Sequence, residues 1–215
     1  MKAIVLLSGG LDSAACLALA LQERREVTAL YVVYGQRHYR EGVSAERLAA
    51  HYDVPLRKVS VRGMPEVALT QSGAELAQHN DGASPAHVPG RNSILLSFAL
   101  SHAEAIGADE VWIGACRDDQ PGFIDCRPGF FRAWQTTANV SVGTNRRVCI
   151  RTPLAARPKG GRGGVGKLAE SLGVPVDLTW SCYTPKLPHG VGYSMNNLEQ
   201  CGECDACKAR ARALA

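Results

Sequence analysis

The chain has 215 residues, of which 46% are hydrophobic, so it can bury a core of ordinary size without needing disulfides. A net charge of +4 suits a protein that handles polyanions, but it is too small to require nucleic acid as a partner. Ser8, Gly9, Gly10 and Asp12 interrupt the apolar N-terminal run, which argues against a secretory signal. We therefore expect a cytoplasmic protein that does not enter a membrane, with cysteines that are reduced or metal-bound.

Short apolar and β-branched runs alternate along the chain with segments of helical spacing. In chain order the pattern predicts a strand over 3–7, a helix over 14–23, a strand over 27–34, a helix over 44–52, a strand over 56–61, a helix over 92–106, a strand over 110–115, a helix over 129–140 and a strand over 147–152. Such alternation implies right-handed crossovers. We therefore predict an α/β fold with a five-stranded parallel sheet flanked by helices.

Two connections break this rhythm. Residues 62–89 form a long polar stretch, which is typical of a lid or a binding loop. Residues 157–166 read RPKGGRGGVG, which holds too many glycines for a stable helix and predicts a mobile segment.

The sequence SGGLDS at 8–13 lies directly between the first predicted strand and the first predicted helix. Its glycines let the backbone approach a ligand, and the helix N-terminus offers amides and partial positive charge to an anion. Asp12 beside a phosphate indicates Mg²⁺ between them. A glycine-rich turn capped by Asp12 is the alternative interpretation. We assign the phosphates of ATP to Ser8, Gly9, Gly10, Leu11, Asp12, Ser13 and Ala14.

SGGLDS resembles the signature of the N-type ATP pyrophosphatases, which cleave ATP between the α- and β-phosphates and adenylate a substrate oxygen. Four further stretches occur in the order found in the 7-cyano-7-deazaguanine synthase family: YGQRH at 34–38, VPGRN at 88–92, DCRP at 125–128 and TWSCY at 179–183. This resemblance covers nearly the whole chain. It implies an adenine nucleotide alpha hydrolase-like, Rossmann-like fold and a homodimer.

The same resemblance implies an AMP-producing ligase of queuosine biosynthesis. Such an enzyme converts 7-carboxy-7-deazaguanine and ammonia to 7-cyano-7-deazaguanine with ATP and Mg²⁺, through acyl-adenylate and amide intermediates, and releases AMP and pyrophosphate.

Most of the matching residues follow predicted strands, where ligands of such a sheet bind. Arg91 could hold a carboxylate or phosphate with two hydrogen bonds, although a lone arginine more often forms a surface salt bridge. His38 is equally a proton carrier or a helix cap. The catalytic candidates are Asp12, Ser13, Arg91 and Asp119, and the substrate-binding candidates are Gln36, Arg37, His38, Arg91, Asn92, Asp125 and Arg127.

Three cysteines near the C-terminus, Cys201, Cys204 and Cys207, are spaced as metal ligands, and Cys182 is the natural fourth. Four thiolates make a closed tetrahedral zinc site of the structural type. An iron–sulfur cluster is the alternative. We expect an ATP-pyrophosphatase domain over 1–178 and a zinc-binding segment packed on it over 179–215.

The chain departs from the family pattern in three places. Residues 186–200 form an insert between the first two zinc cysteines. After the strand predicted over 110–115, Asp119, Gly122, Asp125 and Cys126 match the family, whereas Cys116 replaces an asparagine and Pro121, Phe123 and Ile124 differ. The family's lysine after the fifth strand has two candidate replacements, Lys159 and Arg162.

These departures motivate an alternative function. A paralogue could adenylate the same carboxylate but stop at the amide, or pass the acyl group to an amine of a protein or another molecule. A non-catalytic nucleotide- or nucleic-acid-binding module is a further alternative, suggested by the basic tail at 208–212. The intact phosphate loop argues against it, and the tail is equally a solvated last helical turn. Nucleic acid is therefore not expected as a partner.

Overall fold

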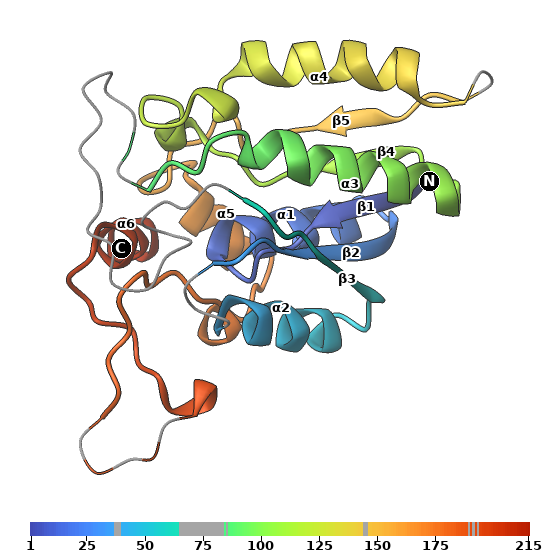
Figure 1. The fold of residues 1–215 in the computed structure, drawn as a ribbon. Helices are drawn as coiled ribbons and strands as arrows, with labels where there is room; N and C mark the ends of the chain where they lie inside the picture. The colour runs from blue at the N-terminus through green and yellow to red at the C-terminus, as the bar shows by residue number, and fades with distance from the viewer. Residues whose placement is uncertain are drawn as a thin grey trace.

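The computed structural model describes residues 1–36, 40–64, 84, 86–143, 146–188, 190, 192 and 194–215. Five parallel strands form one sheet in the order β3-β2-β1-β4-β5 (Figure 1). They are β1 (Lys2–Leu6), β2 (Glu26–Val33), β3 (Leu56–Ser60), β4 (Glu110–Trp112) and β5 (Cys149–Arg151). The predicted parallel sheet is confirmed, with strand bounds that differ by up to three residues.

Helices cover both faces of the sheet. One face packs against α1 (Leu11–Gln22), α2 (Arg40–His51) and α5 (Val165–Ser171), and the other against α3 (Arg91–Ile106) and α4 (Pro128–Ser141). α6 (Asp205–Leu214) lies beyond the carboxyl ends of the strands (Figure 1). Short 3₁₀ turns are η1 (Arg117–Asp119), η2 (Ile124–Cys126), η3 (Val176–Leu178) and η4 (Met195–Asn197). None of the described helices is long and apolar enough to cross a membrane.

The central strands are apolar at nearly every position because the sheet is buried on both sides. In β1, Ala3 and Val5 belong to the core under α1, α2 and α5, whereas Ile4 and Leu6 belong to the core under α3 and α4. This alternation is the period of a strand, and burial of both faces explains the continuous apolar run that predicted it.

The two edge strands are protected in different ways. At β5, the side chain of Gln135 on α4 accepts a hydrogen bond from Ile150 N (2.8 Å) and donates one to Val148 O (3.0 Å), as a neighbouring strand would. At β3, Arg57 and Lys58 are exposed and charged. Charged side chains are a common feature of edge strands that stay unpaired.

Two glycines of the segment 157–166 pack closely on α6. A Cβ on Gly160 would lie 2.4 Å from Arg212 O, and one on Gly166 would lie 1.6 Å from Ala213 O. The absence of a helix is confirmed for 157–164, but α5 begins at Val165, where the prediction was wrong. The helices α5 and α6 were not predicted as such, because glycines and cysteines dominate the sequence around them. Of the connection 62–89, positions 65–83 and 85 lie outside the described residues.

Candidate active site and metal centre

The phosphate loop joins β1 to α1 at the carboxyl edge of the sheet. Ser8 Oγ donates to Ser13 Oγ (3.1 Å), and Ser13 Oγ donates to Gly10 O (2.9 Å), which fixes the turn. Gly10 occupies the N-cap of α1 without a side-chain hydrogen bond to the helix. The first amides of α1 are therefore not capped by that residue, and such helix N-termini favour anions.

The two glycines of the loop differ in their surroundings. Gly9 has φ of +90°, and a Cβ there would lie 2.3 Å from Glu41 O on α2. Its carbonyl accepts a hydrogen bond from Trp180 N (2.8 Å). Gly9 and Ala14 thus pack the loop against its surroundings and do not line the cavity, whereas Gly10 does. The close approach to a ligand predicted for both glycines is therefore available at Gly10.

Asp12 of α1 and Asp119 of η1 converge on the ammonium group of Lys159. Lys159 Nζ lies 3.3 Å from Asp12 Oδ2 and 3.0 Å from Asp119 Oδ1. One ligand-type atom from each of Asp12, Cys116 and Asp119 lies within 4.8 Å of the others. Burial raises the pKa of Asp12, and Lys159 opposes that shift. Burial opposes the charge of Lys159, but the two carboxylates outweigh it and raise the pKa of that amine.

The glycine-rich segment delivers Lys159 to this position. Lys159 N donates to Asp118 Oδ2 (3.0 Å), and Gly166 N donates to Lys159 O (3.1 Å). Arg162 of the same segment is exposed and does not line the cavity. The sequence left both Lys159 and Arg162 open as the replacement for the family's lysine. Of the two, only Lys159 lies in the cavity beside Asp12 and Asp119.

The start of α3 supplies a second cation. Asn92 N donates to Asp125 Oδ2 (3.2 Å) and Asn92 Nδ2 donates to Asp125 O (3.0 Å), so the buried Asp125 caps the helix. The guanidinium of Arg91 lies 5.9 Å from the centre of the Phe123 ring. Burial opposes the charge of Arg91, but Tyr34 and Asp125 keep the pKa of this guanidinium above its usual value. Arg91 and Asn92 line the cavity, whereas Asp125 supports them from behind.

The remaining predicted substrate-binding residues are not all at the cavity. The buried Gln36 lines it, accepts from Tyr34 N (2.7 Å) and donates to Tyr31 Oη (3.1 Å). Arg127 is exposed, and its Nε donates to Gln120 O (3.0 Å) outside the cavity. Arg37 and His38 lie outside the described residues, so both interpretations of His38 remain predictions.

The loop after β1, the start of α3, η1 and the segment around Lys159 line one cavity of about 990 Å³ at the carboxyl edge of the sheet. The cavity spans the point between β1 and β4 where the strand order reverses. This is the place where doubly wound sheets bind ligands. Its described wall includes Glu41, which the sequence did not indicate as functional. It also includes Lys159, Tyr183, Arg210 and Arg212, which lie in stretches that the sequence singled out without assigning them to a substrate site. A signal existed for Glu41, because it follows the YGQRH stretch closely.

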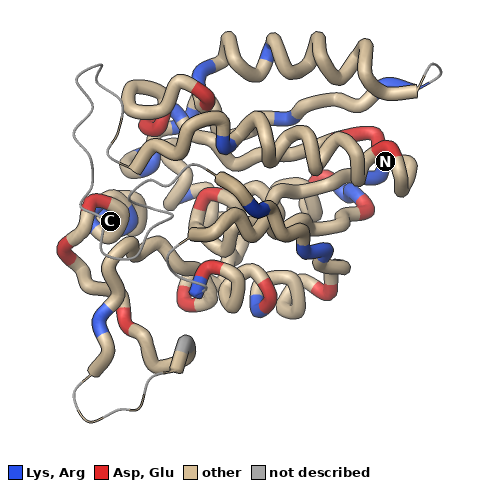
Figure 2. Tube along the Cα trace, in the orientation of Figure 1, with Lys and Arg blue, Asp and Glu red and all other residues tan. Residues whose placement is uncertain are grey.

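The basic tail belongs to α6 and turns partly inward. Arg210 donates to Thr179 Oγ1 (2.6 Å) and to Val176 O (2.8 Å), and both Arg210 and Arg212 line the cavity. Acidic and basic residues occur together around α6 (Figure 2). Part of the tail therefore belongs to the cavity wall, while Lys208 and Arg212 are exposed to solvent.

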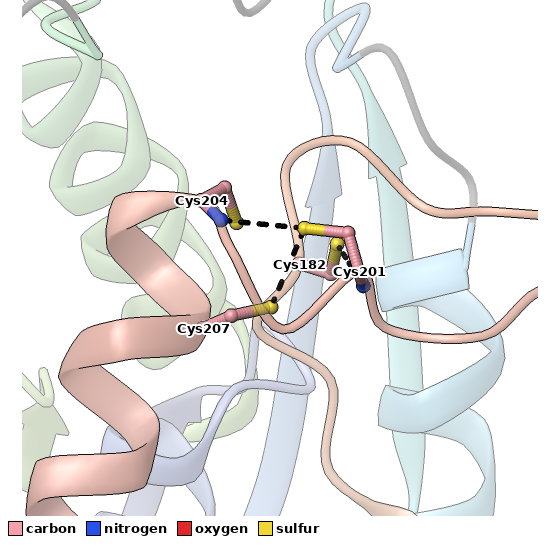
Figure 3. Close-up of side chains that lie close together, drawn as sticks. All are labelled: Cys182, Cys201, Cys204 and Cys207. Atoms are coloured by element: carbon pink, nitrogen blue, oxygen red, sulfur yellow. Dashed lines mark hydrogen bonds between the residues drawn. The ribbon is translucent and has the colours of Figure 1, made fainter.

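The four predicted metal-ligating cysteines lie together (Figure 3). Cys204 and Cys207 stand at the start of α6, whereas Cys182 and Cys201 come from two loop segments. Burial opposes charge on Cys201, but hydrogen bonds from Thr184 and from the amides of Cys204 and Glu203 lower the pKa of its thiol to about 6. Amide donors of this kind are common around metal thiolates.

The spacing of the sulfur atoms fits a single tetrahedral ion. One Sγ from each cysteine lies within 4.8 Å of the others, and Cys201 Sγ is 3.9 Å from Cys207 Sγ. Four thiolates about 2.3 Å from zinc would lie about 3.8 Å apart. An iron–sulfur cluster would put several iron and sulfide atoms between the thiolates and so separate them further.

A parallel sheet in this order, with an SGGLDS loop between β1 and α1, is typical of the phosphate-loop class of adenine nucleotide alpha hydrolase-like folds. The U34-tRNA thiolase NcsA from Methanococcus maripaludis, solved with its [4Fe-4S] cluster, matches this fold with a TM-score of 0.50 and 19% identity. The match covers 81% of this chain and 58% of that chain.

Sequence relatives narrow the class. Residues 2–215 match the family described as Queuosine biosynthesis protein QueC. Proteins named 7-cyano-7-deazaguanine synthase from Oceanobacillus iheyensis and Thermoplasma volcanium are each 38% identical over 97% of this chain, and the matches cover 91% and 84% of those proteins. The chain therefore belongs to the Queuosine biosynthesis protein QueC family.

Proposed function

We propose that the protein is an ATP-dependent 7-cyano-7-deazaguanine synthase. The observation that carries this proposal is the convergence of the phosphate loop, the acidic pair with Lys159, and Arg91 on one cavity. This arrangement places anion donors, carboxylates and cations around one reaction space, as adenylation of a carboxylate requires. Family membership and the names of the relatives support the choice of substrate.

In the proposed reaction, a carboxylate oxygen of 7-carboxy-7-deazaguanine attacks the α-phosphorus of ATP and pyrophosphate leaves. Ammonia displaces AMP from the acyl-adenylate and gives the amide. A second ATP activates the amide oxygen, and loss of AMP leaves the nitrile.

The residues of the chain mainly position the reactants and neutralise charge. The amides of α1 and the hydroxyls of Ser8 and Ser13 would bind phosphate oxygens, and Lys159 would neutralise the departing pyrophosphate. Arg91, backed by Phe123, would hold the substrate carboxylate. Asp12 and Asp119 provide the oxygen ligands that Mg²⁺ prefers, whereas the thiol of Cys116 is a poor ligand for it. Bound Mg²⁺ would supply charge neutralisation at the phosphates.

We propose zinc as the ion of the four-cysteine cluster, in a structural role. Four protein ligands leave no open coordination position for chemistry. The ion would join the start of α6 to Cys182 and Cys201, and so hold one wall of the cavity in place.

Mass spectrometry of a reaction with 7-carboxy-7-deazaguanine, Mg-ATP and ammonium tests the proposal. We expect the nitrile together with AMP. Formation of AMP with products that stop at the amide would replace the proposal by the paralogue described above. No AMP and no pyrophosphate from the metal-loaded protein would overturn it.

One observation favours testing the paralogue directly. Phe123, which departs from the family pattern, lines the cavity beneath Arg91, and Cys116 lies in the acidic cluster. Phe123 therefore faces the proposed substrate region, whereas the buried Cys116 lies beside the proposed Mg²⁺ ligands and does not line the cavity. The insert 186–200, by contrast, contributes none of its described residues to the cavity; Asn196 instead accepts hydrogen bonds from Arg40 and Arg47 of α2. Intact-mass analysis of candidate protein acceptors in the same reaction would detect acyl transfer.

A further inference from the structure

The carboxylate of Glu41 has no role in the proposed adenylation. Glu41 lies in the first turn of α2, is half-buried and lines the cavity. Among the described residues it has neither a hydrogen bond nor an ion pair. By contrast, Asp12 and Asp119 share Lys159, and Asp118 accepts from the Lys159 amide. A carboxylate that faces a cavity and has no partner in the described part of the chain is costly to bury, so a positively charged or proton-donating ligand would satisfy it.

Two glycine contacts fix the place of Glu41. The backbone of Glu41 packs on the phosphate loop, where a Cβ on Gly9 would lie 2.3 Å from Glu41 O. The next residue, Gly42, packs on Tyr31, where a Cβ would lie 3.0 Å from the ring. Both contacts depend on the absence of a side chain. The backbone of Glu41 is therefore held against the loop that would bind the phosphates, and its side chain lines the same cavity as Ser8, Gly10 and Asp12.

The groups that face Glu41 come from three directions. They are Tyr31 and Tyr34 from the end of β2, Arg91 from α3 and Tyr183 from the segment before the metal cluster. Burial raises the pKa of Glu41 to about 7, and Arg91 opposes the shift. Burial also raises the pKa of Tyr183, with Lys159 and Arg91 opposing and with Glu41 and Asp119 adding to it. Tyr183 is thus within electrostatic range of both Asp119 and Glu41, and all three line the same cavity.

We propose that Glu41 binds the ammonium ion that supplies the nitrogen and accepts one of its protons. This inference rests on the proposed function. Ammonium gives a proton to the Glu41 carboxylate and becomes ammonia. The nitrogen lone pair then forms the C–N bond to the acyl carbon, and the C–O bond to AMP breaks with its electron pair going to AMP. The surplus proton on nitrogen passes to water.

A different occupant would be the guanine-like edge of the substrate, whose N–H groups could also pair with a carboxylate. That edge lies on the far side of the bicyclic ring from the reacting carboxyl group. Glu41 packs against the phosphate loop, beside the site of adenylation, which favours the small nucleophile over the distant edge of the ring.

The variant Glu41→Gln tests this assignment, with Glu46→Gln as the matched control. Glu46 lies on the same helix but is exposed and pairs with Lys58 outside the cavity. The first measurement is carboxylate-dependent exchange of pyrophosphate into ATP without ammonium, and the second is amide formation against ammonium concentration. In Glu41→Gln we expect exchange within about threefold of the parent, a raised KM for ammonium and amide formation about 100-fold slower at low ammonium. Glu46→Gln should match the parent in both.

Hydroxylamine provides a rescue, because it is largely uncharged at neutral pH and needs no deprotonation before attack. We expect Glu41→Gln to form the hydroxamate nearly as fast as the parent. Loss of exchange in step with amide formation would assign Glu41 to substrate binding and overturn the inference, as would an unchanged KM for ammonium. A parent protein without exchange would overturn the proposed function itself, which is a distinct result.

Discussion

The two sides of the cavity differ in what holds them in place. The phosphate-loop side rests on α1, whose Ala14, Ala15, Cys16 and Leu17 are completely buried against the sheet. The opposite side, from Trp180 to α6, has a small core of its own in which cysteines are half of the buried residues. In the proposed reaction, the phosphate-binding residues belong to the side held by the main core, whereas the other wall of the cavity is the side that a metal ion would hold together.

The largest loss of activity is expected from substitution of Asp12, which lies on the phosphate-loop side of the cavity. Asp12→Ala removes a carboxylate that would bind Mg²⁺ and that pairs with Lys159. We expect pyrophosphate release to fall by about 10³-fold, with the metal content of the cysteine cluster unchanged. Exchange assays and elemental analysis of the same preparation check both parts. Normal turnover would remove Asp12 from the mechanism.

Lys159 reaches the same cluster from a segment that packs on α6. Lys159→Met should slow exchange by about 100-fold, because the cation beside Asp12 and Asp119 is lost. The matched control is Arg162→Met in the same segment, which should match the parent because Arg162 is exposed and outside the cavity. Equal losses in the two variants would contradict the assignment of Lys159.

Disruption of the four-cysteine cluster should affect the two sides of the cavity differently. We expect Cys201→Ser to lower metal content and to slow exchange by about 10- to 100-fold. Hydrogen exchange followed by mass spectrometry should show faster exchange in α6, with β1, β2 and α1 protected as before. Uniform loss of protection would mean that the ion supports the whole fold and that the two sides are not distinct.

A smaller effect is expected from overpacking the contact between the glycine-rich segment and α6. Gly166→Ala places a Cβ where Ala213 O would lie 1.6 Å away, so we expect a loss of about 1–3 kcal/mol of stability. Gly129→Ala in α4 is the control, because its nearest atom is the flexible tip of Arg132 at 3.8 Å. Thermal denaturation should show destabilisation only in the first variant.

The smallest effect concerns Glu41 and pH. Its folded-state pKa of about 7 lies above the ordinary value of 4.5, so the folded state favours the protonated form. The stability that this group contributes is complete below pH 4.5 and is lost as pH rises through 7. Glu41→Gln should therefore raise stability by about 1–2 kcal/mol at pH 8 and by less at pH 5. Melting curves at both pH values check this, and an equal gain at both would contradict it.

The sequence predicted the sheet, its parallel strands and the position of the phosphate loop, because burial on both faces leaves continuous apolar runs. It also grouped the four cysteines correctly. It began α2 at Ser44 and not at Arg40, so Glu41 fell outside the predicted helix and its place on the phosphate loop was missed. It could not choose between Lys159 and Arg162, because only the packing of the glycines on α6 sets the direction of each side chain. Arg127 shares a motif with Asp125, yet the turn at η2 directs it away from the cavity.

Gln135 has a consequence for how molecules of this protein meet one another. By bonding to Ile150 N and Val148 O, its amide occupies the backbone groups that a strand from a second molecule would need. One margin of the sheet is therefore closed by a single side chain, and the other carries the charges of Arg57 and Lys58. We therefore expect little tendency for the sheet to extend from chain to chain at high protein concentration, and we expect any self-association to use helices or loops.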